Sequence, residues 1–227
     1  MKLAEKVALV TGASEGIGKA IVEHLVLEDV KVIAVSRSIE SKLTPKGVVA
    51  KNCDISKLED VKKLTDFIAS EFGQLDIVIN NAGIWQKVGQ LEDVDDSTVA
   101  TVLDTNLKGM IYVTKYCLPL LHKAEESALV NVVSKSGIVA QAGQSVYTAS
   151  KYGAKGFTDV LREDLKETNI HILGVYQSGT NTEMFAKTGE DFPTDKFTQP
   201  EDLAATIVGA IGAPEKFWVN ELHVNYK

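Results

Sequence analysis

The sequence predicts an α/β fold, a doubly wound parallel sheet of about seven strands with helices on both faces in a single domain. Two observations predict it. Short apolar runs alternate with longer segments of helical spacing, and the apolar runs contain few polar residues. Such alternation implies right-handed crossovers between parallel strands, and strands covered on both faces need apolar side chains throughout. The 227 residues suffice for one large domain, residues 1–227, with a full core.

Each expected strand is a short apolar run that ends in small or polar residues. In chain order, strands are expected at residues 6–10, 31–36, 47–54, 75–80, 128–134, 170–176 and 221–225. The segments between them carry apolar residues three and four positions apart, as amphipathic helices do. Helices are expected at residues 16–29, 56–72, 96–121, 145–167 and 200–212, with the segment 96–121 forming one long helix.

Composition excludes several classes of function. The net charge of −7 argues against nonspecific binding to nucleic acids and against docking on anionic membranes. No apolar run approaches the roughly 20 residues that span a bilayer, and the N-terminal residues lack a signal-peptide layout. Cys53 and Cys117 are expected to be buried thiols of a cytoplasmic protein. The four histidines are scattered, so no metal site is expected.

A glycine-rich loop, VTGASEGIG at residues 10–18, follows the first expected strand and opens the first helix. Gly12 would allow the tight turn, Gly16 would admit a pyrophosphate close to the backbone, and Gly18 would let helix and strand pack closely. The free N–H groups and the dipole of the helix start favour an anion. The loop therefore predicts dinucleotide binding, although such a turn can also need glycine for its shape alone.

Tyr147 and Lys151 are four residues apart on an expected helix, so their side chains share one face. A tyrosine hydroxyl with its usual pKa near ~10 is a poor acid–base group at neutral pH. A nearby ammonium stabilises the phenolate and lowers that pKa, which would suit Tyr147 to proton transfer. The alternative is a half-buried packing tyrosine beside a solvated lysine.

Five motifs occur in the order and spacing of a known family. They are TGASEGIG, NNAG at residues 80–83, TNLKG around Asn106, NVVSKSG around Ser134 and YTASK at residues 147–151. From about residue 6 onward, the chain resembles the short-chain dehydrogenase/reductase family, whose members are single Rossmann-type domains. The resemblance implies hydride transfer between a nicotinamide and a carbonyl or alcohol carbon, with Tyr147 as acid and base. It implies catalytic roles for Asn106 in a proton relay, for Ser134 at the substrate oxygen, and for Lys151 beside the tyrosine and the nicotinamide ribose.

The same resemblance implies a set of cofactor contacts distributed over the ends of the strands. They are Gly12, Ser14, Gly16, Ile17, Gly18, Ser36, Arg37, Asp54, Ile55, Asn80, Ala82, Gly83, Tyr147, Lys151, Thr180 and Thr182. Asp54 could equally form a turn before the next helix, and the two roles are compatible.

The end of the second expected strand bears on the choice between NADP and NAD. An acidic residue there would bind the 2′-hydroxyl of the adenine ribose and favour NAD. The chain instead has Ser36, Arg37 and Ser38, which suit a 2′-phosphate. Glu15 in the glycine loop argues the other way, because it would repel a phosphate. NADP is therefore expected, and NAD stays possible.

The loop after the sixth expected strand departs from the family pattern. Gln177 and Ser178 stand where the family has Pro and Gly, so we expect a cofactor loop that is less pre-organised. A short substrate lid is expected around residues 182–200. The apolar side chains of this lid are Met184, Phe185 and Phe192, and Trp85 is a further candidate for the wall of the substrate pocket. They suggest a small or medium apolar carbonyl or alcohol substrate.

Two further expectations follow from the resemblance. The family usually assembles as tetramers or dimers, so a homo-oligomer is expected. The alternative to an enzyme is a dinucleotide-binding regulator or sensor on the same fold with little turnover.

Overall fold

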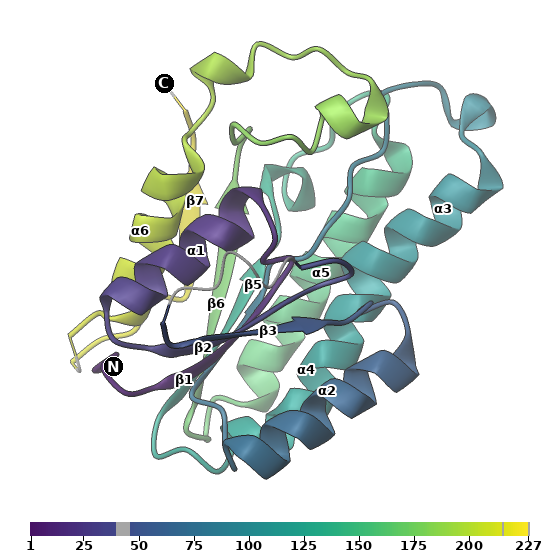
Figure 1. Cartoon of the computed structure of the whole chain (residues 1–227). Helices are drawn as coiled ribbons and strands as arrows, with labels where there is room; N and C mark the ends of the chain where they lie inside the picture. The colour runs from purple at the N-terminus through teal and green to yellow at the C-terminus, as the bar shows by residue number, and fades with distance from the viewer. Residues whose placement is uncertain (40–45, 215, 227) are drawn as a thin grey trace.

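The structure is a computed structural model, and it describes residues 1–39, 46–214 and 216–226. Seven parallel strands form one sheet in the order β3-β2-β1-β4-β5-β6-β7 (Figure 1). The predicted doubly wound sheet of a single α/β domain is confirmed. The strands are β1 Val7–Thr11, β2 Lys31–Ser36, β3 Val48–Asn52, β4 Ile77–Asn80, β5 Ser127–Val132, β6 Ile170–Gln177 and β7 Glu221–Val224.

Helices cover both faces of the sheet. The pair α1 and α6 lies on one face, and α2, α4 and α5 lie on the other (Figure 1). The helices are α1 Gly16–Leu27, α2 Leu58–Glu71, α3 Asp96–Leu103, α4 Met110–Leu121, α5 Ser145–Asp164 and α6 Pro200–Ile211. Among the described residues, no helix has both the length and the apolar character that crossing a membrane requires.

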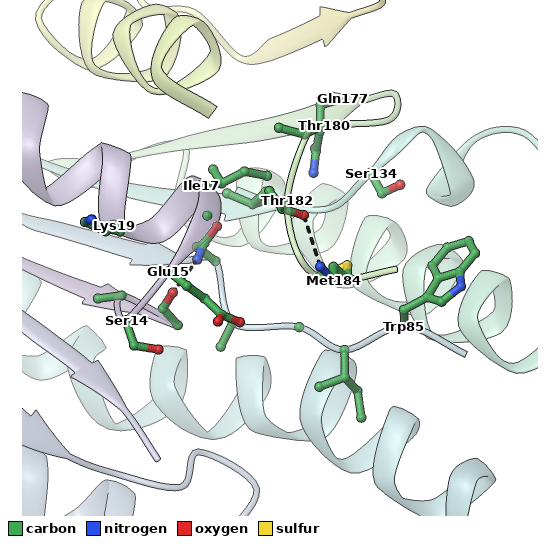
Figure 2. Close-up of a pocket in the computed structure, with 18 of the residues that line it drawn as sticks. Ser14, Glu15, Ile17, Lys19, Trp85, Ser134, Gln177, Thr180, Thr182 and Met184 are labelled. Atoms are coloured by element: carbon green, nitrogen blue, oxygen red, sulfur yellow. Dashed lines mark hydrogen bonds between the residues drawn. The ribbon is translucent and has the colours of Figure 1, made fainter. Parts of the chain in front are cut away.

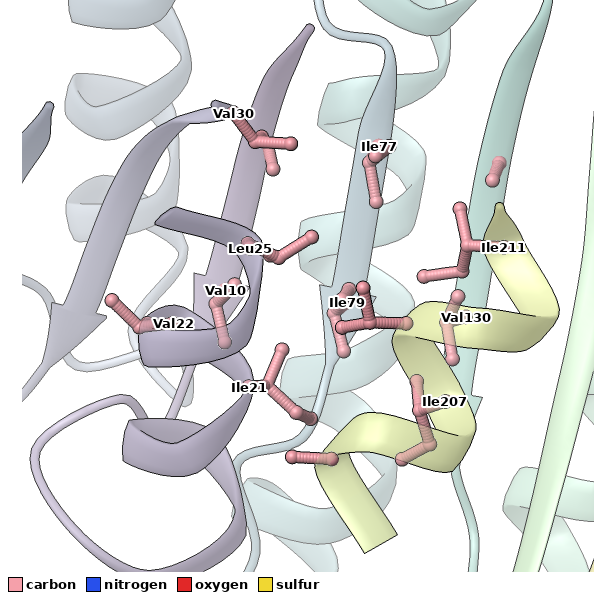
Figure 3. Packing of buried hydrophobic residues seen from close by; sticks show 14 of the residues in the cluster. Val10, Ile21, Val22, Leu25, Val30, Ile77, Ile79, Val130, Ile207 and Ile211 are labelled. Atoms are coloured by element: carbon pink, nitrogen blue, oxygen red, sulfur yellow. The ribbon is translucent and has the colours of Figure 1, made fainter. Parts of the chain in front are cut away.

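The core consists of one apolar layer on each side of the sheet. Successive strand residues point to opposite faces, so Ala8 and Val10 of β1 belong to one layer while Val7 and Leu9 belong to the other. Figure 3 shows the first layer, in which α1 and α6 pack over β1, β4 and β5. Its central contacts are made by Val10, Ile21, Leu25, Ile79, Val130, Ile207 and Ile211. Burial on both faces explains why the central strands β1 and β4 are almost wholly apolar.

The long helix expected over residues 96–121 is not uniform. A π-helical segment, Asp104–Gly109, separates α3 from α4, so the expectation of one regular helix is wrong here. Asn106 lies in this segment, fully buried. Its amide bonds to the loop after β4 and to α5, and these contacts compensate for the poorer helical geometry. Single-turn π segments of this kind occur often at functional sites.

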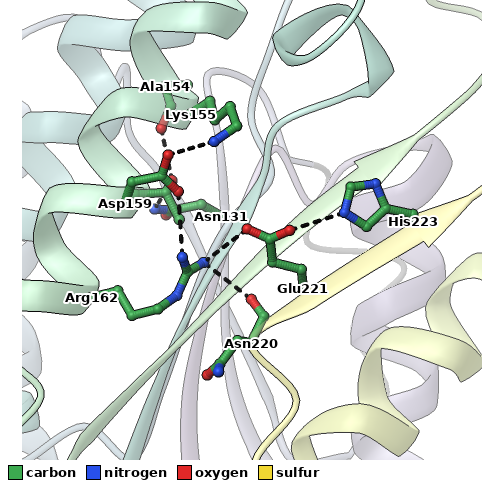
Figure 4. Close-up of polar contacts among 9 residues, drawn as sticks. Asn131, Ala154, Lys155, Asp159, Arg162, Asn220, Glu221 and His223 are labelled. Atoms are coloured by element: carbon green, nitrogen blue, oxygen red, sulfur yellow. Dashed lines mark hydrogen bonds and ion pairs between the residues drawn. The ribbon is translucent and has the colours of Figure 1, made fainter.

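A polar network fixes α5 against the edge strand β7. Arg162 of α5 lies 3.4 Å from Asp159 and 3.6 Å from Glu221, and it donates to the carbonyl of Asn220 at 3.2 Å (Figure 4). Glu221 also contacts His223 at 3.0 Å. Arg162 is thus a structural residue, and the network holds one end of the helix whose other end carries Tyr147.

The order of the strands places a crevice at one edge of the sheet. The chain builds outward from β1 through β2 to β3, and then returns to add β4 on the opposite side of β1. The crossovers on the two sides of this point therefore run in opposite directions. In open α/β sheets, ligands bind outside the carboxyl ends of the strands where the direction reverses.

Candidate functional site

A cleft of about 1260 Å³ lies at the carboxyl ends of the strands. It is lined by the segments that follow β1 through β6, so one cavity collects residues from the whole sheet edge (Figure 2). The expected site residues that line it are Gly12, Ser14, Gly16, Ile17, Ser36, Arg37, Asp54, Ile55, Ala82, Gly83, Ser134, Tyr147, Lys151, Thr180 and Thr182. Gly18, Asn80 and Asn106 do not line it.

The glycine loop has the backbone geometry that its sequence requires. Gly12 and Gly16 have φ values of +65° and +51°, which side chains rarely tolerate. A Cβ on Gly18 would lie 2.2 Å from the carbonyl oxygen of Gly12, so this glycine lets α1 approach the loop. Asn81 braces the turn by donating to the carbonyls of Thr11 and Gly12 at 2.9 and 3.2 Å. Sequence reasoning missed this role of Asn81.

Replacing Gly18 by alanine should lower stability and dinucleotide affinity together, because the methyl group would push the turn from its position. We expect a loss of about 1–3 kcal/mol in the free energy of unfolding, typical of overpacking. The matched control is Gly209→Ala in α6, where a Cβ would meet nothing within 4 Å. This control should stabilise the protein by about 0.5–1 kcal/mol. Urea unfolding of both variants measures the difference, and equal effects would contradict the packing role.

Ser36, Arg37 and Asp54 occupy the end of the cleft beside β2 and β3. The Ser36 hydroxyl is buried and has no hydrogen-bond partner among the residues that the structure describes. Arg37 is exposed and makes no ion pair within the described ranges. Asp54 accepts from the backbone N–H and hydroxyl of Ser56 at 3.1 and 2.6 Å, which is the turn expected before α2. Ser36 and Arg37 thus have polar groups available for a ligand.

Two asparagines of the motifs serve as internal braces. Asn80 is buried behind the cleft and donates to Thr114 and to Asn131, both at 2.9 Å. Asn80 does not line the cleft, and its expected cofactor contact stays a prediction. The Asn106 amide accepts from the backbone N–H of Ile84 at 2.8 Å and donates to the carbonyl of the same residue at 2.9 Å. This pair of bonds fixes the loop after β4, which lines the cleft.

Ser134, Tyr147 and Lys151 lie together at the opposite end of the cleft from Arg37. The Lys151 ammonium lies 5.7 Å from the centre of the Tyr147 ring and donates to the carbonyl of Val132 at 3.3 Å. Ser134 has a φ of 111°, a strained value for a residue with a side chain, and such strain clusters at functional sites. Backbone strain at Ser134 thus coincides with the proposed chemistry.

Burial dominates the titration of this pair. It raises the pKa of Tyr147 to about 12, while the hydroxyl of Ser134 acts in the opposite direction. It lowers the pKa of Lys151 to about 8. The expectation that the lysine lowers the tyrosine pKa is thus not met in the protein alone, because both side chains are withdrawn from water. Tyr147 is therefore a protonated phenol at neutral pH.

Gln86 positions Tyr147, and sequence reasoning missed it. Its side-chain oxygen accepts from the backbone N–H groups of Val146 and Tyr147, both at 2.9 Å. These are free N–H groups at the start of α5, so Gln86 acts as a cap supplied by the loop after β4. No local sequence signal could have revealed this contact, because the two segments are 60 residues apart.

An aromatic wall closes the cleft beside Tyr147. The Trp85 ring lies 4.5 Å from the ring of Tyr147 and 5.0 Å from that of Phe185, measured between centroids. Phe185 also contacts Phe192 at 5.1 Å. Glu190 fixes this arrangement, because its carboxylate accepts from the indole N–H of Trp85 and from the backbone N–H of Val88.

A second contact joins residues 182–200 to the glycine loop. Lys187 forms an ion pair with Glu15 across the mouth of the cleft. The pairing neutralises the charge that would otherwise argue against a phosphate at Glu15. Both side chains are more than half exposed, so the pair contributes little to stability.

The loop that begins at Gln177 has anchors that the sequence does not reveal. The backbone N–H of Ser178 donates to the carbonyl of Val224 at 2.8 Å, and its hydroxyl accepts from the N–H of Tyr226 at 3.1 Å. The C-terminal strand thus fixes the place where the family has Pro and Gly. These bonds restrain the loop on one side, and its expected lower pre-organisation stays a prediction.

Comparison with known proteins identifies the family. A family model described as short chain dehydrogenase matches residues 6–192. The chain belongs to the short-chain dehydrogenase family. An uncharacterized oxidoreductase of Staphylococcus aureus (strain MRSA252) is 31% identical, over 98% of this chain and 97% of its own. Members of the family are NAD(P)-dependent oxidoreductases that act on small substrates, so the predicted class of activity is confirmed.

Solved structures of the family agree with the fold and differ in their cofactor. The 3-ketoacyl-(acyl-carrier-protein) reductase of Brucella melitensis in complex with NADH is 26% identical, with a TM-score of 0.87. The coverage is 98% of both chains. The closed form of a serine dehydrogenase in complex with NADP+ is 25% identical, with a TM-score of 0.89 and coverage of 96% and 94%. Similarity of this degree does not decide between the two cofactors.

The cleft fits a dinucleotide on its own evidence. Gly12 and Gly16 form a cradle that side chains would fill. At either end a buried oxygen lacks a hydrogen-bond partner among the described residues, Ser36 Oγ beside β2 and Gln177 Oε1 at the end of β6. Among the residues that the structure describes, no group of three His, Cys, Asp or Glu side chains could hold a metal ion.

Proposed function

We propose that the protein is an NADPH-preferring reductase of small or medium carbonyl compounds, able also to oxidise the corresponding alcohols. The observation that carries this proposal is that Ser134, Tyr147 and Lys151 share one cleft with the glycine loop. A dinucleotide in that loop and a substrate at Tyr147 would meet in a single cavity. The burial of Tyr147 and Lys151, each only 5% exposed, favours electrostatic control of a proton there.

When bound, the cofactor supplies or accepts the hydride. Tyr147 donates its phenolic proton to the substrate oxygen as negative charge develops on it, and Ser134 donates a hydrogen bond to the same oxygen. The raised pKa of Tyr147 keeps it protonated and ready for this step at neutral pH. The Lys151 ammonium stabilises the phenolate that remains, and we propose that it also binds the nicotinamide ribose. The side-chain amide of Asn106 already bonds to Ile84 and Ser150. We therefore propose that Asn106 takes part in the proton relay through its backbone carbonyl.

The preference for NADPH rests on the end of the cleft beside β2. Arg37 supplies a guanidinium without an ion-pair partner among the described residues, and the buried Ser36 hydroxyl is available to the same ligand. The acidic side chains that line this side of the cleft, Glu15, Glu23 and Asp54, each form an ion pair with a lysine. A phosphate on the adenine ribose would thus meet a net positive environment.

Replacing Arg37 by leucine should weaken NADPH binding and leave NADH binding unchanged. A charged hydrogen bond contributes about 1.5–3 kcal/mol, so NADPH affinity should fall by about 10- to 100-fold. Fluorescence titration of both reduced cofactors measures this, with NADH as the internal control. Tighter binding of NADH than NADPH by the wild type would contradict the preference.

The aromatic wall suggests the kind of substrate. Trp85, Met184, Phe185 and Phe192 line the cleft near Tyr147, so an apolar group beside the carbonyl would be bound there. We propose that residues 182–200 form the substrate lid. The decisive assay follows NADPH oxidation over a panel of small and medium ketones and aldehydes. Turnover of apolar members supports the proposal, and cofactor binding without any turnover would favour the regulator or sensor instead.

We also propose a homotetrameric or dimeric assembly in the cytoplasm. Cys53 and Cys117 are both free and buried, as thiols are in a reducing compartment. Tyr152 and Val160 leave apolar surface exposed on α5, which a second copy could cover. Light scattering during size-exclusion chromatography tests the assembly, and a monomeric mass would contradict it.

A further inference from the structure

Gln177 carries an unexplained polar group in the cleft. It is the last residue of β6, the residue is only 9% exposed, and it lines the cavity. Its Oε1 atom has no hydrogen-bond partner among the residues that the structure describes. Buried amide groups in native proteins are almost always paired, so an unpaired one at a cleft points to a ligand. Figure 2 shows the side chain reaching from the end of β6 toward the loop that carries Thr182.

The strand register places Gln177 beside the reacting groups. Val132 of β5 pairs with Val175 of β6, and Ser134 and Gln177 each lie two residues beyond this pair. The backbone N–H of Ser134 donates to the carbonyl of Val175 at 3.2 Å, so the segment that follows β5 still lies beside β6 there. The Gln177 amide therefore borders the part of the cleft that holds the proposed proton donor.

The hydroxyls in the same loop are already engaged. Thr180 donates to the carbonyl of Ser178 at 3.4 Å, and Thr182 accepts from the backbone N–H of Met184 at 3.4 Å. Neither bond is short, and each hydroxyl keeps further hydrogen-bonding capacity for a ligand. In this loop, Gln177 has a buried acceptor atom, Oε1, that has no hydrogen-bond partner among the described residues. Its backbone is held by pairing with Val224, so the amide is presented from a fixed position.

We propose that Gln177 binds the carboxamide of the nicotinamide ring, an inference that rests on the proposed function. A primary amide offers one acceptor oxygen and two N–H donors. Two such amides complement each other, with Gln177 Oε1 accepting from the nicotinamide N–H and Gln177 Nε2 donating to the nicotinamide oxygen. The glutamine would replace contacts that the family makes with a Pro-Gly turn, and it would fix the rotation of the ring.

The test is the binding of NADP+ and of its 3-acetylpyridine analogue to the wild type and to Gln177→Met. The analogue keeps the ring and its carbonyl but replaces the amide nitrogen by a methyl group. Isothermal titration measures affinity without turnover. Gln177→Met should weaken NADP+ binding about tenfold, equivalent to about 1.4 kcal/mol. Analogue binding should weaken by a smaller factor, because the analogue can only accept the hydrogen bond from Gln177 Nε2. The preference of the wild type for the amide cofactor should therefore shrink.

Two controls separate this role from a structural one. Ser178→Ala removes a loop anchor without touching the amide, so it should change both affinities by the same factor. Thermal unfolding without cofactor should show Gln177→Met to be at least as stable as the wild type, because an unpaired buried oxygen is removed. Equal losses for both ligands in Gln177→Met, or no loss for either, would overturn the inference. A wild type that binds neither dinucleotide would overturn the proposed function as well.

Discussion

Tyr147→Phe should abolish carbonyl reduction while the affinity for NADPH stays within about twofold of the wild type. The substitution removes the hydroxyl proposed to donate the proton, and general acid catalysis contributes about 10²–10⁴-fold to a rate. Phenylalanine preserves the ring that packs against Trp85 at 4.5 Å, so the aromatic wall should survive. Steady-state rates on the best ketone of the panel, with cofactor titration alongside, measure both effects.

The matched control for this variant is Tyr152→Phe. Tyr152 belongs to the same helix but is 45% exposed and lies outside the cleft, so the loss of its hydroxyl should leave the rate unchanged. A Tyr147→Phe enzyme that retains the wild-type rate would show that another group delivers the proton. Loss of rate together with loss of NADPH binding would instead indicate a folding defect, which thermal unfolding detects.

Lys151→Met should abolish turnover and at the same time stabilise the fold. Burial lowers the pKa of Lys151 from 10.5 to about 8, so the folded protein accommodates a cation that water no longer solvates. A lowering of the pKa from 10.5 to about 8 corresponds to a loss of about 3 kcal/mol in the free energy of unfolding at pH 7. Methionine fills a similar volume without charge. Activity thus depends here on a residue that opposes folding, as is common at active sites.

The stability gain of Lys151→Met should depend on pH in a defined direction. Below pH 8 the folded wild type holds the buried cation, so the variant has its full advantage. Between pH 8 and 10.5 the folded protein releases this proton while the unfolded chain retains it, and the advantage shrinks. Urea unfolding at pH 7 and pH 10 measures the difference between variant and wild type. Lys166→Met, at a lysine that is 61% exposed, should show no such trend.

The sequence predicted the parts of the site that depend on local geometry. The shape of the glycine loop depends on the positive φ of Gly12 and Gly16 and on the close approach of α1 at Gly18. These are local requirements for glycine, so the sequence indicates them directly. The sharing of one helix face by Tyr147 and Lys151 likewise follows from helical periodicity. The parallel sheet was predictable because strands buried on both faces read as nearly continuous apolar runs, as β1 and β4 do.

Other features depend on contacts between distant segments, and these could not be predicted. The π segment around Asn106 exists because its amide bonds to Ile84 and Ser150, neither of which is near in sequence. Gln86 caps α5 from another loop for the same reason. The pKa of Tyr147 depends on burial, which outweighs the lysine that spacing alone suggests.

The most direct test of the account follows the hydride itself. NADPH that carries deuterium at both C4 positions is incubated with the enzyme and a ketone that it turns over, and the alcohol product is analysed by mass spectrometry. The account predicts a product that contains one deuterium at the carbinol carbon, and no labelled product with Tyr147→Phe. Alcohol without label, or labelled alcohol at the same rate from both enzymes, would contradict direct hydride transfer with Tyr147 as the acid.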